Sequence, residues 1–118
     1  LDANGGLVFR NSRDCTLAGL HVNGVWRKPS ALAIERCDRF NISNCTILDS
    51  DGIGLWLQDC TQTRVAGCLI RDDRAERKAT LSLKAVGGRG NWITQNLVAD
   101  GHEIAPGTAL VEGNFGRD

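Results

Sequence analysis

The most constraining feature of this chain is a pattern of apolar residues and cysteines that occurs twice, 23 residues apart. The first copy consists of Leu32, Ile34, Cys37, Phe40, Ile42, Cys45 and Ile47, and the second of Leu55, Leu57, Cys60, Thr63, Val65, Cys68 and Ile70. Apolar pairs two residues apart are typical of short strands that bury alternate side chains, whereas a helix needs a period of about 3.6 residues. The repetition therefore predicts a repeat architecture in which each unit packs on its neighbours.

The template extends in both directions along the chain. Upstream it begins at Leu7 and Phe9; downstream we place it at Leu81 and Leu83, with a two-residue insertion after Val86. A partial copy begins at Ala109 and Val111. Each coil is predicted to contain about three short strands, stacked at the ~4.8 Å spacing of paired strands. Two interior columns follow, one of Leu7, Leu32, Leu55 and Leu81 and one of Phe9, Ile34, Leu57 and Leu83.

This pattern resembles the right-handed parallel β-helix repeat proteins, the group often called pectin-lyase-like. The resemblance covers nearly all of the chain and implies an all-β solenoid of about four complete coils plus one partial coil. It implies a fold and not an activity, because the repeated inward-pointing skeleton is shared by many functions.

The length of 118 residues predicts one domain, residues 1–118. Formal net charge is zero and no long block of like charge exists, which gives no electrostatic support for binding nucleic acid or an anionic membrane. The sequence contains no Met and opens within the pattern at Leu1, so we expect a segment excised from a longer parent. An exported parent, extracellular or periplasmic, is a hypothesis that these residues do not decide.

Five cysteines raise the question of metal or disulfide chemistry. Cys37 and Cys60 share one predicted interior column, and Cys45 and Cys68 share another. The C-x7-C spacing lacks the C-x2-C pairs that bring two thiolates to one zinc ion. We therefore expect buried free thiols and no metal site, with a disulfide between stacked cysteines as the alternative.

A candidate binding face lies on the outer side of the first strand of each coil. The predicted outward residues are Val8, Ala33, Trp56, Ser82 and Leu110, and beside them Arg10, Glu35, Gln58, Lys84 and Glu112. Trp56, flanked by Arg10, Glu35, Gln58 and Lys84, has the chemistry of a saccharide-stacking platform. Pectin-active members of the resembling group bind saccharides along such an outer groove. The alternative is that a loop of this chain, or another part of the parent, covers Trp56.

A second candidate site lies where each coil joins the next. Asp49, Asp72 and Asp100 occupy one template position, and Asp51, Asp73 and His102 follow closely. Asp51, Asp72-Asp73 and Gly101-His102 resemble the catalytic set of polygalacturonases, although Glu103 breaks the Gly-His-Gly motif. Stacked carboxylates can perform acid/base chemistry on a glycosidic bond, or Asp49, Asp72 and Asp100 can hold Ca²⁺. The competing interpretation is ordinary turn chemistry.

Two functional hypotheses follow from these features. The first is a non-catalytic β-helix segment of a carbohydrate-associated protein that binds a polysaccharide on the outer face of the first sheet. The second is part of a polysaccharide lyase or glycoside hydrolase that uses the junction carboxylates. Because terminal coils expose strand edges and interior residues, we also expect end-to-end self-association near Leu7, Phe9, Leu110 and Val111, or contact with the rest of the parent chain.

Overall fold

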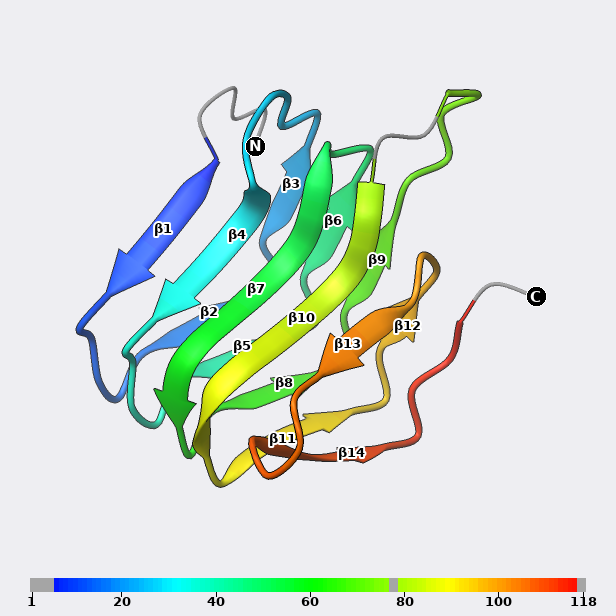
Figure 1. Cartoon of the computed structure of the whole chain (residues 1–118). Helices are drawn as coiled ribbons and strands as arrows, with labels where there is room; N and C mark the ends of the chain where they lie inside the picture. The colour runs from blue at the N-terminus through cyan, green and yellow to red at the C-terminus, as the bar shows by residue number, and fades with distance from the viewer. Residues whose placement is uncertain (1–5, 77–78, 117–118) are drawn as a thin grey trace.

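A computed structural model describes residues 6–76 and 79–116 of the chain, and in this part every secondary-structure element is a strand. The strands form three parallel sheets, which wind into a right-handed solenoid of about four turns (Figure 1). The predicted parallel β-helix is therefore confirmed. No helix in the described residues is long and apolar enough to cross a membrane.

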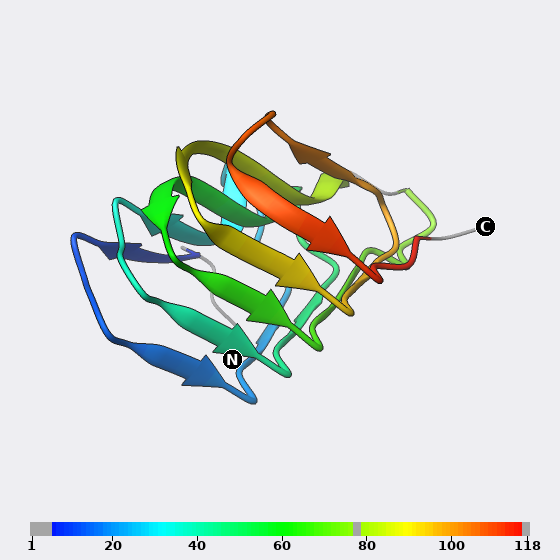
Figure 2. The ribbon, with the colours of Figure 1, turned by 90° about the horizontal axis from the view of Figure 1, so that it is seen from below.

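Each of the first four coils contributes one strand to each sheet, and the last, partial coil contributes a strand to the first and second sheets. The first sheet contains β1 (Leu7–Arg10), β4 (Ser30–Glu35), β7 (Gly52–Thr61), β10 (Ala79–Arg89) and β13 (His102–Ile104). The second contains β2 (Thr16–Ala18), β5 (Asn41–Ser43), β8 (Arg64–Ala66), β11 (Asn91–Thr94) and β14 (Ala109–Glu112), seen side by side in Figure 2. The third contains β3 (His21–Asn23), β6 (Thr46–Leu48), β9 (Leu69–Arg71) and β12 (Leu97–Val98).

The interior consists of columns of apolar side chains, as the repeat predicts. Leu7 pairs with Leu32 and Leu32 with Leu55, while Phe9, Ile34 and Leu57 form the neighbouring column. Leu32, Ile34 and Leu55 have no exposed surface. Since no coil can bury its own apolar face, the stability of each coil depends on its neighbours.

Our sequence-based register of the fourth coil was wrong by two residues. Leu83, and not Leu81, pairs with Leu55, and Ala85 pairs with Leu57. The register of β10 shifts between Ala79 and Leu81, so the extra residues precede Leu81 and do not follow Val86. The last coil also begins elsewhere, because His102 pairs with Leu83 in the first sheet. Residues Ala109–Glu112 form β14 of the second sheet.

Corner length explains this error. Across the first corner, eight residues separate the inward pairs Phe9 and Leu17, Ile34 and Ile42, Leu57 and Val65, and Ala85 and Ile93. Across the second corner the separation is five, in Leu17 and Val22, Ile42 and Ile47, Val65 and Ile70, and Ile93 and Val98. Across the third it varies: ten from Val22 to Leu32, eight from Ile47 to Leu55, thirteen from Ile70 to Leu83 and four from Val98 to His102.

The corners of the fourth coil are held by buried asparagines. The Asn91 side chain accepts the Thr63 N–H and donates to the Cys60 and Thr108 carbonyls, each at 2.9 Å. Asn96 lies in the column above Cys45 and Cys68 and contacts the coils on both sides. These side chains satisfy backbone groups that the sharp corners leave unpaired.

The cysteines occupy the columns that the repeat predicts. All five are free; Cys37, Cys45, Cys60 and Cys68 are buried, and Cys15 is half-buried. Each thiol donates to a backbone carbonyl, as Cys60 does to Ile34 at 3.2 Å. Burial raises the pKa of the Cys60 thiol and raises that of Cys68 to about 11. The prediction of buried free thiols is confirmed for these four residues.

Candidate functional site

The outer face of the first sheet carries Trp56, as predicted, but its neighbours differ. One outward row contains Val8, Ala33, Trp56, Lys84 and Glu103. Lys84 therefore replaces Ser82 in this row, and Ser82 is buried. Leu110 lies on the second sheet and not on this face. The exchange of Ser82 for Lys84 follows from the two-residue shift in coil four, and the placement of Leu110 follows from the last coil entering the first sheet at His102.

Trp56 is more enclosed than an open stacking platform would be. The Lys84 ammonium lies 5.3 Å from the centroid of the Trp56 ring. Trp56 is half-buried, and its indole N–H is buried without a hydrogen-bond partner among the described residues. Ala33, beside it in the row, is only 4% exposed. A sugar stacking on Trp56 would thus compete with the cation–π contact of Lys84.

The second predicted row on this face is correct for three coils. Arg10, Glu35 and Gln58 are paired in register, and Arg10 forms an ion pair with Glu35. In coil four the row continues with Val86, while Glu112 lies on the second sheet. The predicted binding residues Arg10, Glu35, Gln58, Lys84 and Trp56 therefore share one sheet face, with Lys84 beside Trp56.

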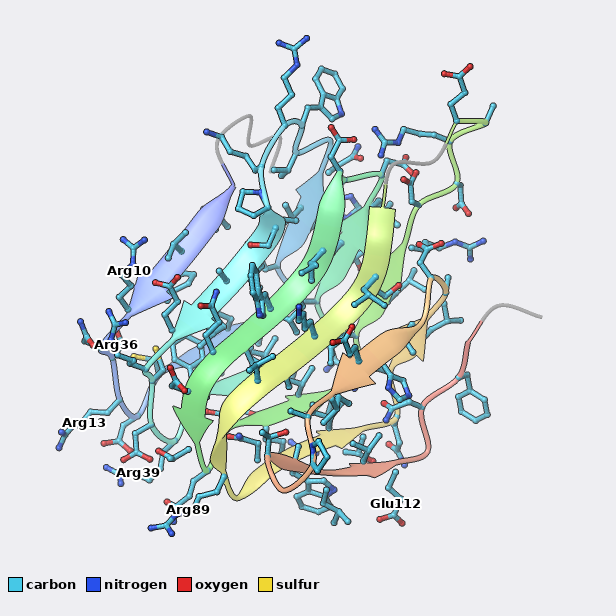
Figure 3. All side chains as sticks on the ribbon, in the orientation of Figure 1. Arg10, Arg13, Arg36, Arg39, Arg89 and Glu112 are labelled. Atoms are coloured by element: carbon cyan, nitrogen blue, oxygen red, sulfur yellow. The ribbon has the colours of Figure 1, made fainter. Side chains whose placement is uncertain are left out.

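Arginines project from the corner between the first and second sheets (Figure 3). Arg39 binds both oxygens of Asp14, at 2.6 and 3.0 Å, and also contacts Asp38 at 2.9 Å. This hydrogen bonding holds the pKa of Asp14 below its usual range. Arg36 donates to Asn11 at 3.1 Å. These contacts link coil one to coil two, so part of this charged corner serves the stacking of the coils.

The junction carboxylates lie close together, as predicted, around Arg74. Arg74 donates to Asp72 from Nε at 2.8 Å and from Nη2 at 2.7 Å, and Nη2 lies 3.0 Å from Asp51. Hydrogen bonding to Asp72 raises the pKa of the Arg74 guanidinium above its ordinary value. The Asp72 side chain is only 1% exposed. Asp72 is therefore held in a fixed, buried contact, while the Arg74 side chain keeps some exposed surface.

The other junction carboxylates accept backbone N–H groups from adjacent loops. Asp49 accepts from Asp73 at 2.9 Å, Asp100 from Asp72 at 3.0 Å, and Asp51 from Arg27 at 2.9 Å. Asp73 forms an ion pair with Arg71 at 2.8 Å. These contacts favour the interpretation of the cluster as turn chemistry between coils.

The structure does not bring His102 into this cluster as a turn residue. His102 lies in β13, in the inward column of the first sheet beside Leu83, and is exposed. The cavity next to Asp72, Asp100, Ser50 and Ser82 measures only about 10 Å³, room for roughly one water molecule. A sugar cannot enter this space, so it is not a substrate pocket for Asp72, and Asp51, Asp73 and His102 do not line it.

Metal binding by the junction residues has no geometric support either. Within residues 6–76 and 79–116, no group of three or more His, Cys, Asp or Glu side chains is arranged to hold a metal ion. Asp49, Asp72 and Asp100 each bind an N–H group or a guanidinium, as described above. The Ca²⁺ hypothesis for these three residues therefore gains nothing from the structure.

An open cleft lies beside the cluster, at the edge of the third sheet. It has a volume of about 270 Å³. Trp26, which is 55% exposed, forms one wall. The remaining lining residues are Asn23, Gly24, Asp49 and Arg74. We name this feature the Trp26 cleft; it places an aromatic ring, a carboxylate, an amide and a guanidinium around one space.

Sequence reasoning identified Asp49 but missed Trp26 and Asn23 as site residues. Trp26 follows the tight turn Asn23-Gly24 and lies in a loop with Arg27 and Lys28. The sequence did contain a signal for this site, namely a tryptophan in a polar loop one coil below the junction carboxylates. A large apolar side chain in such a loop often serves binding.

The chain was compared with known protein families, curated proteins and solved structures. No individual curated protein and no solved structure matches it. The family model described as "Periplasmic copper-binding protein (NosD)" matches residues 1–108, which include β1 to β13. The match covers most of the chain and agrees with its parallel β-helix. The chain therefore belongs to the NosD family.

Proposed function

We propose that this chain is a non-catalytic β-helix segment of an exported, periplasmic protein and that it binds a neutral saccharide in the Trp26 cleft. The family description supports the compartment. The observation that carries the binding proposal is the exposed Trp26 ring facing the same open space as Asn23, Asp49 and Arg74. Saccharide recognition needs this combination, because a sugar ring has apolar C–H surfaces and a rim of hydroxyl groups.

The polar groups of the cleft are held in place before a ligand arrives. Asp72 and Asp51 fix the Arg74 guanidinium, and Asp49 accepts the Asp73 N–H through one oxygen. A carboxylate retains further acceptor capacity, and a guanidinium has five N–H donors. Fixed donors and acceptors lower the entropy cost of binding.

The charge around the cleft favours a neutral ligand. Of the charged residues that line the cleft, Arg74 is compensated by Asp51 and Asp72, while Asp49 adds a carboxylate; the nearby Asp73 is paired with Arg71. An acidic sugar would meet like charge at this position, whereas hydroxyl groups can donate to Asp49 and accept from Arg74 or Asn23.

The copper in the family description was tested against the donors of this chain. The four buried thiols donate to backbone carbonyls, and burial raises the pKa of Cys60 and Cys68, which opposes formation of the thiolates that bind copper. His21 and His102 lie on different sheets, in the first and the last coil. The described donors do not fit a copper site, and we assign this segment no role through copper.

The proposal is tested by titrating the chain with neutral oligosaccharides while following tryptophan fluorescence and the heat of binding. We expect Trp26→Ala to weaken binding at least roughly tenfold, the equivalent of about 1.4 kcal/mol, with unfolding free energy changed by less than about 0.5 kcal/mol. Phe115→Ala is the matched control, because Phe115 is an exposed aromatic residue that does not line the Trp26 cleft. Binding that survives Trp26→Ala but is abolished by Trp56→Ala would instead place the site on the first sheet.

The hydrolase or lyase alternative is tested in the same preparation. Release of reducing ends or unsaturated products from acidic or neutral polysaccharides, abolished by Asp51→Asn, would refute a non-catalytic role. Asp51 is the variant of choice because Asp72 is buried in the Arg74 contact and its replacement would disturb folding.

A further inference from the structure

A second exposed aromatic group lies on the outer face of the second sheet. Trp92 is 46% exposed, and Leu110, its register partner on β14, is 59% exposed. On the opposite side of Trp92 the register places Arg64 of β8. These three residues form one outward row across adjacent strands, which we name the Trp92 row. It is separate from the Trp26 cleft, which lies at the edge of the third sheet.

The Trp92 row borders an open cleft with a rigid floor. The cleft has a volume of about 510 Å³ and is lined by Gly90, Asn91, Trp92, Gly107, Ala109 and Leu110. Asn91 is fixed by its three hydrogen bonds of 2.9 Å to the coils on either side. An added Cβ at Gly107 would meet no atom within 4 Å, so the rim is open there. The side of Trp92 toward Leu110, away from the Arg64 guanidinium, is therefore open to a ligand.

The charge of the Trp92 row comes from Arg64, which lies against the exposed ring. The Arg64 guanidinium lies 5.8 Å from the Trp92 ring centroid. Among the described residues Arg64 has no ion pair and no side-chain hydrogen bond, whereas Arg10, Arg39 and Arg74 each bind a carboxylate. An uncompensated guanidinium beside an exposed ring can bind a carboxylate through two parallel hydrogen bonds. The row is thus complementary to a ligand that joins an apolar face to an anion.

We propose that the Trp92 row binds a uronic acid unit of an acidic oligosaccharide. The apolar face of the pyranose ring packs on Trp92 and Leu110, and its carboxylate binds Arg64. This site goes beyond the proposed function, because it lies on another sheet and selects the opposite charge class. A second protein chain is a weaker candidate for this surface. An exposed indole beside an unpaired guanidinium can bind a small anionic ring by itself, whereas a protein partner would need a large interface.

The test is calorimetric titration of the full chain with an oligogalacturonate and with a neutral oligosaccharide of equal length. We expect Arg64→Gln to weaken binding of the oligogalacturonate roughly tenfold or more, since a charge-assisted contact is lost, and to leave the neutral ligand unchanged. Trp92→Ala should abolish oligogalacturonate binding. Rising salt concentration should weaken binding of the wild type but affect Arg64→Gln less.

Arg13→Gln is the matched control, because Arg13 is an exposed arginine of coil one, whereas Trp92 and its cleft lie in coils four and five. It should leave oligogalacturonate affinity unchanged. Trp26→Ala should also leave oligogalacturonate affinity unchanged. The experiment can therefore refute the proposed Trp26 cleft and the proposed Trp92 row independently. Equal affinity for acidic and neutral ligands, or no effect of Arg64→Gln, would overturn the proposal. A change in sedimentation of Trp92→Ala without a change in uronate binding would assign the row to protein contact and would also overturn it.

Discussion

We expect Asn96→Ala to destabilise the chain by about 2–4 kcal/mol, because it leaves buried backbone groups without partners. Asn96 is 1% exposed. Its side chain accepts the Cys68 N–H at 2.8 Å and donates to the Val65 carbonyl at 3.1 Å and to Asn114 Oδ1 at 3.0 Å. Each lost hydrogen bond contributes about 1 kcal/mol, and an unsatisfied buried donor or acceptor costs about 1–3 kcal/mol.

The measurement is urea unfolding followed by tryptophan fluorescence, with comparison of midpoints at constant slope. Asn41→Ala is the control, since Asn41 lies on a strand and its side-chain oxygen has no hydrogen-bond partner among the described residues. Asn96→Cys should be less destabilising than Asn96→Ala, because Cys45 and Cys68 occupy the same column in coils two and three. If the free energy of unfolding of Asn96→Ala lies within about 0.5 kcal/mol of the wild-type value, the Asn96 side chain does not stabilise the corner.

Three further predictions concern backbone strain, the buried thiols and the ends of the solenoid. Gly88→Ala should destabilise by about 3 kcal/mol or more, because Gly88 has φ +74° and an added Cβ would overlap the Cys60 carbonyl; Gly107→Ala, with φ +81° and open space, should cost only about 1 kcal/mol. The Cys68 thiol has an ordinary pKa of 9.0 that burial raises to about 11, so the folded state holds its proton more tightly. Stability is retained below pH 9 and falls by about 2–3 kcal/mol as pH rises to about 11, and Cys68→Ala should flatten this loss in urea titrations at pH 8 and pH 11. Terminal-coil residues Leu7, Phe9 and Val111 are only partly covered, so we expect concentration-dependent end-to-end association in sedimentation; a clean monomer from micromolar to millimolar concentration would contradict it.

The register of coils one to three was predictable because their apolar pairs and corners are unambiguous. The fourth coil was not, since Leu81, Leu83 and Ala85 are all apolar and two residues apart, so a strand pattern of period two cannot distinguish a shift of two. The structure resolves it through the first corner, where eight residues separate Ala85 from Ile93 as in every earlier coil. Constant corner length is thus a better guide to register than constant coil length.

The candidate sites were predictable only in part. The outward direction of Trp56 follows from strand alternation, but its contact with Lys84 depends on the register of coil four. The grouping of Asp49, Asp51 and Asp72 follows from template position, whereas the guanidinium that fixes Asp72 comes from a loop outside the repeat. Asn23 lies in β3, beside Leu48, whereas Trp26 comes to line the same cleft as Asp49 through a loop that no periodicity describes.

The unequal corners also show which parts of this solenoid can vary in length and which parts have a fixed length. Two of its edges have constant length, while at the third edge successive inward residues lie from four to thirteen positions apart in the sequence. Insertions and exchanges of loops can therefore accumulate along a single edge, at little cost to the stacking free energy. Since the Trp26 cleft lies on that edge, ligand preference in such a scaffold can evolve, or be engineered, by grafting loops while the stacked coils stay intact.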